Sequence, residues 1–254
     1  MNWRFMQGRS YQLDKMGLRD LFKAFFTYPT ILVYLGLAIL MIYLASQAEG
    51  SGWMVFTPIL ATILIYPLAW YLIHRFILHG RYLYKIRLTA TAWKRIHFDH
   101  HQDPHNLHVL FGALYTTLPT IFIITVTTGW LIADEIGIYI ACASGLIMTC
   151  FYEFCHCIQH LNYQPRTAFI QKIKKWHLAH HFHNEQGNYG ITNYFWDRLF
   201  KTFYHRPHDV PRSKTVFNLG YTAEEADLYP WVLQKSHGIR RDEGPGKTRQ
   251  KPSE

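Results

Sequence analysis

Four long apolar runs alternate with polar, basic blocks along the chain, and each run is long enough to be a membrane-spanning helix. Their lengths approach or exceed the roughly 20 residues that cross the hydrocarbon core of a bilayer. A pair of buried helical hairpins in a soluble protein is the alternative, but four such runs rarely occur together in a soluble domain. The pattern therefore predicts an all-α protein with four transmembrane helices, at about residues 30–48, 53–73, 107–133 and 136–155.

A shorter amphipathic segment precedes the first run. Between residues 15 and 26 the apolar side chains fall at positions 18, 21, 22, 25 and 26, whereas Lys15, Arg19 and Lys23 fall on another face of a helix. This pattern is typical of a helix that lies in the membrane interface. The N-terminus has no short apolar core followed by a small-residue cleavage site, so we expect no cleaved signal peptide.

Basic residues set the expected orientation in the membrane. All 26 Lys and Arg lie before the first run, between the second and third runs, or after the fourth run. Because segments rich in Lys and Arg stay in the cytoplasm, we expect both termini and residues 74–106 to be cytoplasmic. The net charge of +9 suits a surface that faces anionic lipid headgroups. No nucleic-acid-binding motif accompanies this charge, so nucleic acid is not an expected partner.

These features divide the chain into three parts. Residues 1–29 form an N-terminal cytoplasmic segment that contains the interfacial helix, residues 30–237 form the membrane domain, and residues 238–254 form a polar tail that we expect to be disordered. A cytoplasmic helical cap within the membrane domain comprises residues 74–106 and 156–237. The compact length and the absence of a di-lysine retrieval tail favour a bacterial inner membrane over an endoplasmic reticulum location.

Histidine is frequent, with 16 in the chain, and ten of these residues form four clusters. Positions i, i+3 and i+4 share one face of an α-helix because each residue advances by about 100°. Two His-x-x-His-His blocks and one pair four residues apart have these spacings. The four clusters are His74 with His79; His97, His100 and His101; His156 with His160; and His177, His180 and His181.

The pair His74 and His79 is five residues apart and does not fit a regular helix. Its side chains would diverge by about 140° on an α-helix. To face the same way they need a helix end, a bend or a π-type bulge, and Gly80 is a suitable helix terminus.

The predicted topology brings the four clusters into one layer at the cytoplasmic edge of the membrane. The second and fourth runs cross in the same direction, and the two blocks lie in the cytoplasmic segments that follow them. Neutral imidazole binds Zn, Cu, Fe and Ni, and ten histidines exceed the demand of one metal ion, so they suit a dimetal site. Scattered core histidines are the alternative, but ionisable groups at membrane boundaries are usually functional. Candidate partners for the second ring nitrogens are Asp99, Asp103, Glu153 and Asp197.

The other six histidines are weaker candidates. His105, His108 and His183 could be outer ligands or substrate contacts, although ordinary polar contacts are more common. The remaining three, His205, His208 and His237, are expected at the surface.

Together, the four histidine clusters resemble the signature of the fatty acid hydroxylase/sterol desaturase superfamily of integral-membrane di-iron enzymes. Downstream, residues 188–202 resemble the segment that follows the last histidine block in that family. Lys201 stands where many members have glycine, so the local turn can differ. The resemblance covers about residues 55–205, and the downstream match is carried by Asn188, Gly190, Trp196, Asp197 and Thr202.

The resemblance implies a membrane-bound lipid hydroxylase, an oxidoreductase of the monooxygenase type that uses O2 and two Fe ions held by the ten clustered histidines. It also implies a lipid substrate, such as a fatty-acyl chain of a sphingolipid or another polar lipid. Some members carry a fused haem domain, but the chain has no His-Pro-Gly-Gly or Cys-x-x-Cys-His motif, and its first 29 residues are too few for such a domain. We therefore expect an external electron donor, cytochrome b5-like or ferredoxin-like, that the basic face attracts.

Three other functions stay open at this point. A sterol or carotenoid oxidase or a desaturase would belong to the same superfamily, although acyl desaturases usually lack the His156/His160 pair. A membrane zinc hydrolase would need only three histidines and a carboxylate base. A metal transporter or sensor would need ionisable residues inside the membrane, and residues 24–73 contain only Glu49.

Overall fold

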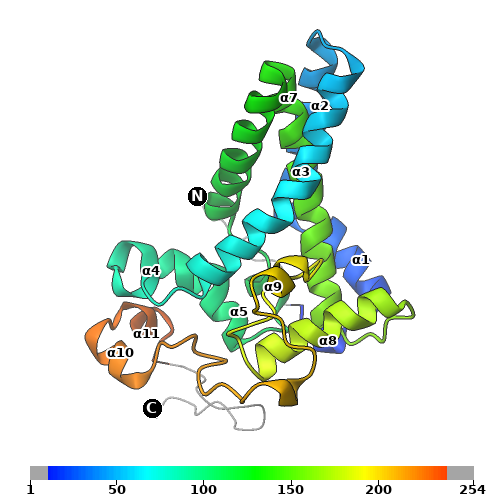
Figure 1. Ribbon diagram of the computed structural model, residues 1–254. Helices are drawn as coiled ribbons and strands as arrows, with labels where there is room; N and C mark the ends of the chain where they lie inside the picture. The colour runs from blue at the N-terminus through cyan, green and yellow to red at the C-terminus, as the bar shows by residue number, and fades with distance from the viewer. Residues whose placement is uncertain (1–10, 239–254) are drawn as a thin grey trace.

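The computed structural model describes residues 11–238, which fold into helices and connecting loops without a strand in that range. Figure 1 shows long helices that extend to one end of the molecule and short helices that gather at the other. The all-α class is confirmed, and the predicted disordered tail lies, from residue 239 on, outside the described residues. The α-helices are α1 (Leu18–Phe26), α2 (Pro29–Gln47), α3 (Gly52–Leu72), α4 (Arg87–Trp93), α5 (Asp99–Gln102), α6 (Leu107–Leu110), α7 (Leu114–His160), α8 (Ala168–Phe182), α9 (Phe195–Leu199), α10 (Ala223–Leu228) and α11 (Trp231–Lys235).

Three helical stretches of the described chain are long and apolar enough to cross a membrane, namely Pro29–Gln47, Gly52–Leu78 and Leu107–His160. α2 and α3 begin within one residue of the predicted starts. The third predicted run is interrupted, because α6 ends at Leu110 and α7 begins only at Leu114. At this break the Arg95 guanidinium donates to the carbonyls of His108 and Phe111, at 2.8 and 3.2 Å, so these carbonyls need no helical partner.

α7 reverses direction where the sequence predicted the connection between the third and fourth runs. Ala133 and Asp134 leave the helical conformation, and Asp134 has a φ of 46°. The two arms of α7 then run side by side (Figure 1). Gly129 and Gly137 face each other across the reversal, and a Cβ atom on either one would collide with the carbonyl group of the other. The reversal therefore depends on two glycines whose backbones touch.

Hydrogen bonds between hydroxyl groups join the long helices. α2 and α3 both pack against α7. The Tyr34 hydroxyl of α2 lies 2.6 Å from Thr117 Oγ1, and the Tyr66 hydroxyl of α3 contacts Thr149 Oγ1. Because an unpaired hydroxyl is costly away from water, these pairs let polar side chains occupy otherwise apolar helices.

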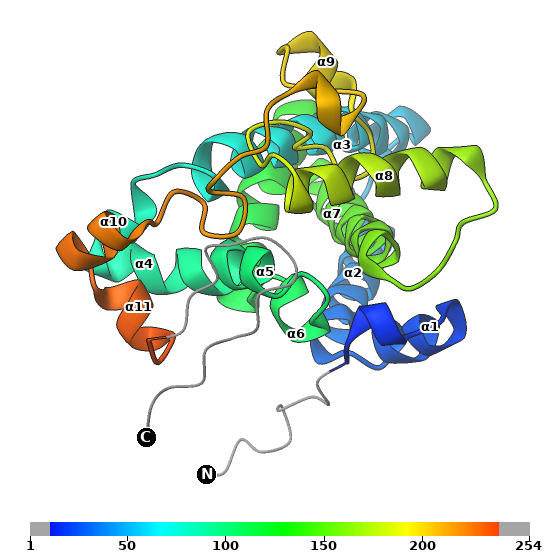
Figure 2. The ribbon, with the colours of Figure 1, turned by 90° about the horizontal axis from the view of Figure 1, so that it is seen from below.

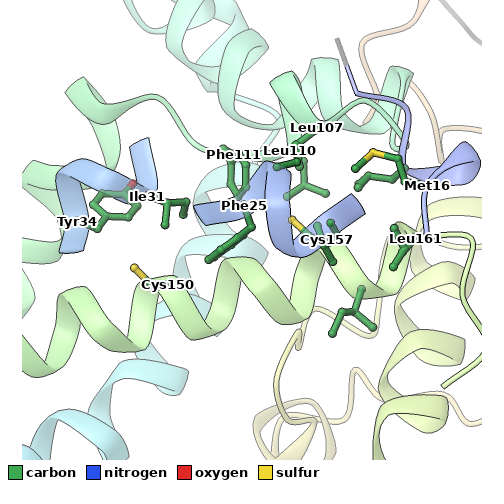
Figure 3. Close-up of a cluster of buried hydrophobic side chains, with 14 of the residues drawn as sticks. Met16, Phe25, Ile31, Tyr34, Leu107, Leu110, Phe111, Cys150, Cys157 and Leu161 are labelled. Carbon is green, nitrogen blue, oxygen red and sulfur yellow. The ribbon is translucent and has the colours of Figure 1, made fainter. Parts of the chain in front are cut away.

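A core of apolar side chains joins α1 to the second arm of α7 (Figure 3). Phe25 lies between Phe111 and Phe154, with ring centroids 5.8 and 5.1 Å apart. On the outer side of α1, Phe22 and Phe26 are 45% and 50% exposed. The predicted amphipathic helix is confirmed as a helix, and its position in the membrane interface stays a prediction.

A second, smaller core holds the C-terminal helices α10 and α11 against α4, as Figure 2 shows. Tyr84, Trp93 and Tyr221 are fully buried in it. The indole N–H of Trp93 donates to the Leu78 carbonyl (2.8 Å), which ties α4 to the end of α3's π-helical continuation. This packing brings the chain that precedes α10 across the region of the clustered histidines.

Candidate metal centre

The ten clustered histidines meet where the long helices join the short ones, and they form two groups of five. Within each group, one nitrogen atom from every ring lies within 4.8 Å of the others. Nine of the ten side chains are buried and His79 is half-buried. The first group contains His74, His79, His97, His101 and His180, and the second group contains His100, His156, His160, His177 and His181.

Each His-x-x-His-His block contributes to both groups. In the first block, His97 and His101 belong to the first group and His100 belongs to the second. In the second block, His180 belongs to the first group, and His177 and His181 belong to the second. The two groups are therefore adjacent, and the ring centroids of His101 and His181 are only 4.2 Å apart. The sequence predicted that the three side chains of a block point the same way, but not that they divide between two neighbouring sites.

Two π-helical segments set the register of the first group. The segment Ile73–Leu78 is a π-helix, and the N–H of His79 donates to the carbonyl of His74, five residues earlier (3.1 Å). The wider turn brings the Nε2 atoms of these two histidines to 3.2 Å. Of the three alternatives that the sequence left open, a helix end, a bend or a π-type bulge, the structure shows the π-helix, which ends just before His79 and Gly80. A second π-helix, Lys94–Phe98, carries His97, whose Nε2 lies 2.8 Å from that of His79.

Backbone carbonyls orient three of the rings from outside. The Nδ1–H group of His74 donates to the Tyr189 carbonyl (2.6 Å), and that of His101 donates to the Val216 carbonyl (2.9 Å). His180 makes the same contact with the carbonyl of Gly187 (2.7 Å). A carbonyl only accepts, so the proton must sit on Nδ1 and the lone pair on Nε2 points into the group.

The carboxylates that were predicted as outer partners lie elsewhere around the centre. The Asp99 carboxylate accepts from the Lys94 ammonium at 2.7 and 2.9 Å. Asp103 accepts from the side-chain amide of Asn106 (3.3 Å). The acceptors for the three rings above are carbonyls instead, and a carbonyl is present at every residue, so no side-chain type could have indicated them.

Several of the inward-facing ring nitrogens have no hydrogen-bond partner among the described residues, which fits bound cations. Among the described residues, no hydrogen bond reaches Nε2 of His101, His156 or His180, or either ring nitrogen of His100 and His181. Buried polar atoms are nearly always paired, so this concentration of unpaired nitrogens indicates a ligand. Imidazole nitrogen is a common donor to Fe, Zn, Cu and Ni, and two adjacent groups of five fit two such ions.

Burial keeps these rings in the form that binds metals. It lowers the pKa of His101 to about 3, although the bond to the Val216 carbonyl raises it. Burial, and then repulsion from neighbouring imidazoles, lowers the pKa of His97 and His181 well below the usual 6.5. At neutral pH the rings are therefore uncharged, and only the neutral ring offers a lone pair.

Residues 59–202, more than half of the chain, match the family described as fatty acid hydroxylase. The chain belongs to the fatty acid hydroxylase family. All ten histidines lie inside the matched region. With its three apolar stretches, this family member is a membrane protein.

Named relatives are similar over part of the chain. The chain is 31% identical over 160 residues to "Ceramide very long chain fatty acid hydroxylase SCS7" of Saccharomyces cerevisiae, covering 61% of this chain and 39% of the yeast protein. It is 30% identical over 144 residues to "Dihydroceramide fatty acyl 2-hydroxylase FAH2" of Arabidopsis thaliana, covering 55% of this chain and 57% of the plant protein. The chain thus spans less than two thirds of either relative.

A solved structure supports the fold. The protein described as "Full length scs7p (only hydroxylase domain visible)" superposes with a TM-score of 0.60 at 26% identity, covering 73% of this chain and 68% of that one. The relatives include proteins from yeasts, a plant and mammals. They give no support to the expected bacterial inner membrane.

The segment after the last histidine block supports the candidate metal centre. Asp197 accepts hydrogen bonds from the N–H groups of Tyr189 and Gly190, at 2.8 and 2.9 Å, and from the Thr202 hydroxyl at 2.9 Å. The Tyr189 carbonyl accepts the hydrogen bond from His74. Asp197 therefore orients the His74 ring indirectly, by fixing the backbone at Tyr189. The sequence predicted that the Asp197 carboxylate would accept a hydrogen bond from an imidazole, but it accepts from the backbone that holds one.

The turn at Lys201 keeps the geometry that glycine would favour. Lys201 has a φ of 59°, in the left-handed region. The N–H of Thr202 still reaches the Asp197 carbonyl at 2.8 Å. Lys201 therefore holds a backbone conformation that glycine adopts without strain.

The support for the centre continues beyond the matched region. Val216, whose carbonyl holds His101, lies after residue 202, where the family match ends. The neighbouring Phe217 carbonyl accepts from the side-chain amide of Gln102 (2.7 Å). Residues 216 and 217, in the C-terminal part of the described chain, therefore support the candidate metal centre.

The weaker histidine candidates make ordinary polar contacts. Nδ1 of His105 donates to the His160 carbonyl (3.0 Å), and Nε2 of His183 donates to the Val210 carbonyl (2.9 Å). His108 lies 3.4 Å from the Tyr28 hydroxyl. None of the three is in either group of five.

A mainly apolar cavity of about 90 Å³ lies beside both histidine groups. Its walls come from α3, from the start of α7 and from the second arm of α7, represented by Trp70, Thr116 and Tyr152. Glu153 is the one carboxylate among the described residues that line it, and its Oε2 atom has no hydrogen-bond partner there. The cavity thus offers an apolar surface with a single acidic anchor beside the candidate metals.

Proposed function

We propose that the chain is a membrane-bound, O2-dependent hydroxylase that inserts a hydroxyl group into a fatty-acyl chain of a sphingolipid or another polar lipid. The observation that carries this proposal is the pair of five-histidine groups beside an apolar cavity. The names of relatives, which refer to ceramide, dihydroceramide and fatty acid hydroxylases, support the substrate class.

In this proposal the ten histidines hold two irons. When bound, the irons would activate O2 for the oxidation of a C–H bond. No amino-acid side chain could break such a bond by itself. The overall reaction takes one C–H bond, one O2, two electrons and two protons, and it gives one C–O–H group and one water. The carbonyls of Tyr189, Gly187 and Val216 keep three ligands in the right tautomer.

The cavity would position the substrate. Its apolar walls exclude water and suit a short stretch of acyl chain, and a longer chain would have to extend through the open side of the cavity. The unpartnered Glu153 oxygen could accept a hydrogen bond from an N–H or O–H group near the lipid head. Such an anchor would fix which carbon lies next to the histidine groups.

We also propose the membrane topology. α2, α3 and the two arms of α7 would make four spans, because the reversal at Ala133 and Asp134 returns the chain to the side from which it came. Both termini and the short helices would then be cytoplasmic, where the Lys and Arg residues gather. An electron donor would reach the centre from that side.

Lipid analysis tests the function. Cells that express the chain with iron supplied should contain lipids that gain one oxygen atom, detected by mass spectrometry, and cells with the His180→Ala variant should not. Loss of two hydrogens would indicate a desaturase instead. No oxygenated lipid of any class would contradict the proposal, provided that the protein is present in the membrane.

A further inference from the structure

A large groove lies on the outer face of α8, the helix that carries the second histidine block. Its volume is about 710 Å³, and its floor includes Leu178 and Phe182. The opposite face of α8 carries His177, His180 and His181, because residues three and four apart share a face. A single helix, about 10 Å across, therefore separates the groove from both histidine groups.

The rim of the groove is basic. Lys174 and Lys175 line the groove, and no Asp or Glu is among the described residues that line it. Two further basic residues, Arg166 and Lys172, lie nearby in the sequence, and residues 155–183 contain no acidic one. Lys174 is held in place because its ammonium donates to the carbonyls of Leu161 and Tyr163. Lys175 is exposed and free to meet a partner's charge. An apolar floor with a charged rim is the usual composition of a protein interface, and complementary charge raises the rate of encounter.

Aromatic rings continue from the groove to the centre. Phe182 follows His181 directly in the chain, and their ring centroids are 6.5 Å apart. The Phe182 ring also stacks on His105 (5.9 Å between centroids), whose Nδ1–H donates to the carbonyl of His160. A redox centre that docks in the groove would thus be close, through space and through bonds, to His160 and His181 of the second histidine group.

We propose that this groove is the docking surface for an acidic one-electron carrier that reduces the histidine-bound centre. The proposal rests on the proposed function, because that reaction consumes two electrons. Anionic lipid headgroups are the other chemistry that fits the basic rim. They are less suitable, because α8 lies at the opposite end of the molecule from the turns that join the long helices, further from them than α1 (Figure 1).

The test uses the full chain, loaded with iron and reconstituted in lipid nanodiscs. The probes are two reduced acidic carriers, a soluble cytochrome b5-type haem domain and a [2Fe–2S] ferredoxin. Lys175→Glu should raise the KM for at least one carrier by about tenfold at low salt, with kcat unchanged, and the difference should disappear as salt screens the charges. Leu178→Ala should raise the same KM at every salt concentration. The matched control is Arg87→Glu, which reverses an exposed charge on α4 and should leave the KM within twofold.

Binding is measured separately, so that a failure of docking can be told from a failure of the proposed function. Carbodiimide should join the carrier's carboxylates to Lys175 of the wild-type chain, whether or not the protein turns over. If methyl viologen radical yields no oxygenated lipid from the wild type, the proposed function is wrong, and the cross-links still decide the docking. An unchanged KM for both carriers in Lys175→Glu, or a weakened binding to anionic vesicles with the KM unaffected, would overturn the docking proposal.

Discussion

Asp197 shows how a residue that touches no imidazole can still determine how a ligand is held. Its carboxylate accepts from two successive backbone N–H groups, of Tyr189 and Gly190, and so fixes the loop whose carbonyl orients His74. The carbonyl contact selects the ring tautomer, and the tautomer decides which nitrogen can bind a metal.

Asp197→Asn should therefore weaken the centre while leaving the ten histidines present. An amide has one acceptor oxygen and would turn an N–H group toward the Tyr189–Gly190 backbone, which costs about 1–3 kcal/mol of folding stability. Metal affinity should fall roughly 10- to 100-fold, as for other outer partners of ligands. Competition with a chelator measures this. The matched control is Asp227→Asn, an exposed residue of α10, and an equal loss in both variants would contradict the role of Asp197.

Lys201→Gly should stabilise the protein. Lys201 is exposed and has a φ of 59°, a conformation that costs about 1–2 kcal/mol for a residue with a Cβ atom. We expect a higher thermal unfolding midpoint in detergent. The same change at Lys172, an exposed position in α8, should lower the midpoint, because glycine disfavours a helix by about 1 kcal/mol. A lower midpoint for Lys201→Gly would show that the side chain makes a contact that outweighs the strain.

Much of the candidate centre could be predicted from residue types and spacing, and part of it could not. The ten histidines are the ones that meet, because imidazole is rare enough for its clustering to be informative. Their division between two groups depends on π-helical and tertiary geometry. The role of the Tyr189 and Val216 carbonyls could not be predicted from the sequence, because every residue has a backbone carbonyl.

At the scale of the elements, the reversal within α7 depends on the contact between Gly129 and Gly137. A Cβ atom at Gly129 would collide with backbone atoms of Gly137, which cannot move aside as a flexible side chain can. The close approach lets two antiparallel arms pack along their length, as small residues do in helix pairs within membranes.

Gly129→Ala should thus lower the thermal unfolding midpoint, because the two arms must separate. Gly36→Ala in α2 is the matched control, since a Cβ atom there would have no heavy atom within 4 Å, and its midpoint should be unchanged. Metal content should stay near the wild-type value in both variants, because the reversal is at the far end of the long helices. Equal midpoints for the two variants would contradict the role assigned to the glycine contact.

The apolar pattern predicted the long helices to within a residue at the starts of α2 and α3. Mean hydropathy is calculated over windows of many residues, so it identifies helices of this length reliably. It did not predict the break between α6 and α7, because that break depends on the Arg95 guanidinium, which comes from another segment of the chain. The short helices α9 to α11 had no periodic signal, since only a few of their side chains are buried.

For the whole molecule, the buried histidines make stability depend on pH. Their folded-state pKa values lie below the usual 6.5, at about 3 for His101. Below pH 6.5 the unfolded chain binds protons that the folded chain does not, so stability is full above about pH 6.5 and is lost as the pH falls toward 3.

The metal-free protein should accordingly show a falling thermal unfolding midpoint between pH 6.5 and pH 4. His101→Leu should make this fall shallower, because one low-pKa group is gone, whereas His237→Leu, at an exposed position, should not change it. A midpoint that stays constant over this pH range in the wild type would contradict the burial of neutral rings.

The central claim is that two adjacent groups of five histidines hold a pair of metal ions, and metal analysis of the purified protein tests it most directly. Protein expressed with iron and measured by inductively coupled plasma mass spectrometry should contain two iron atoms per chain. His180→Ala should contain clearly fewer, and His237→Ala should contain two. A wild-type protein with no transition metal, or a His180→Ala variant with its full complement, would contradict the account.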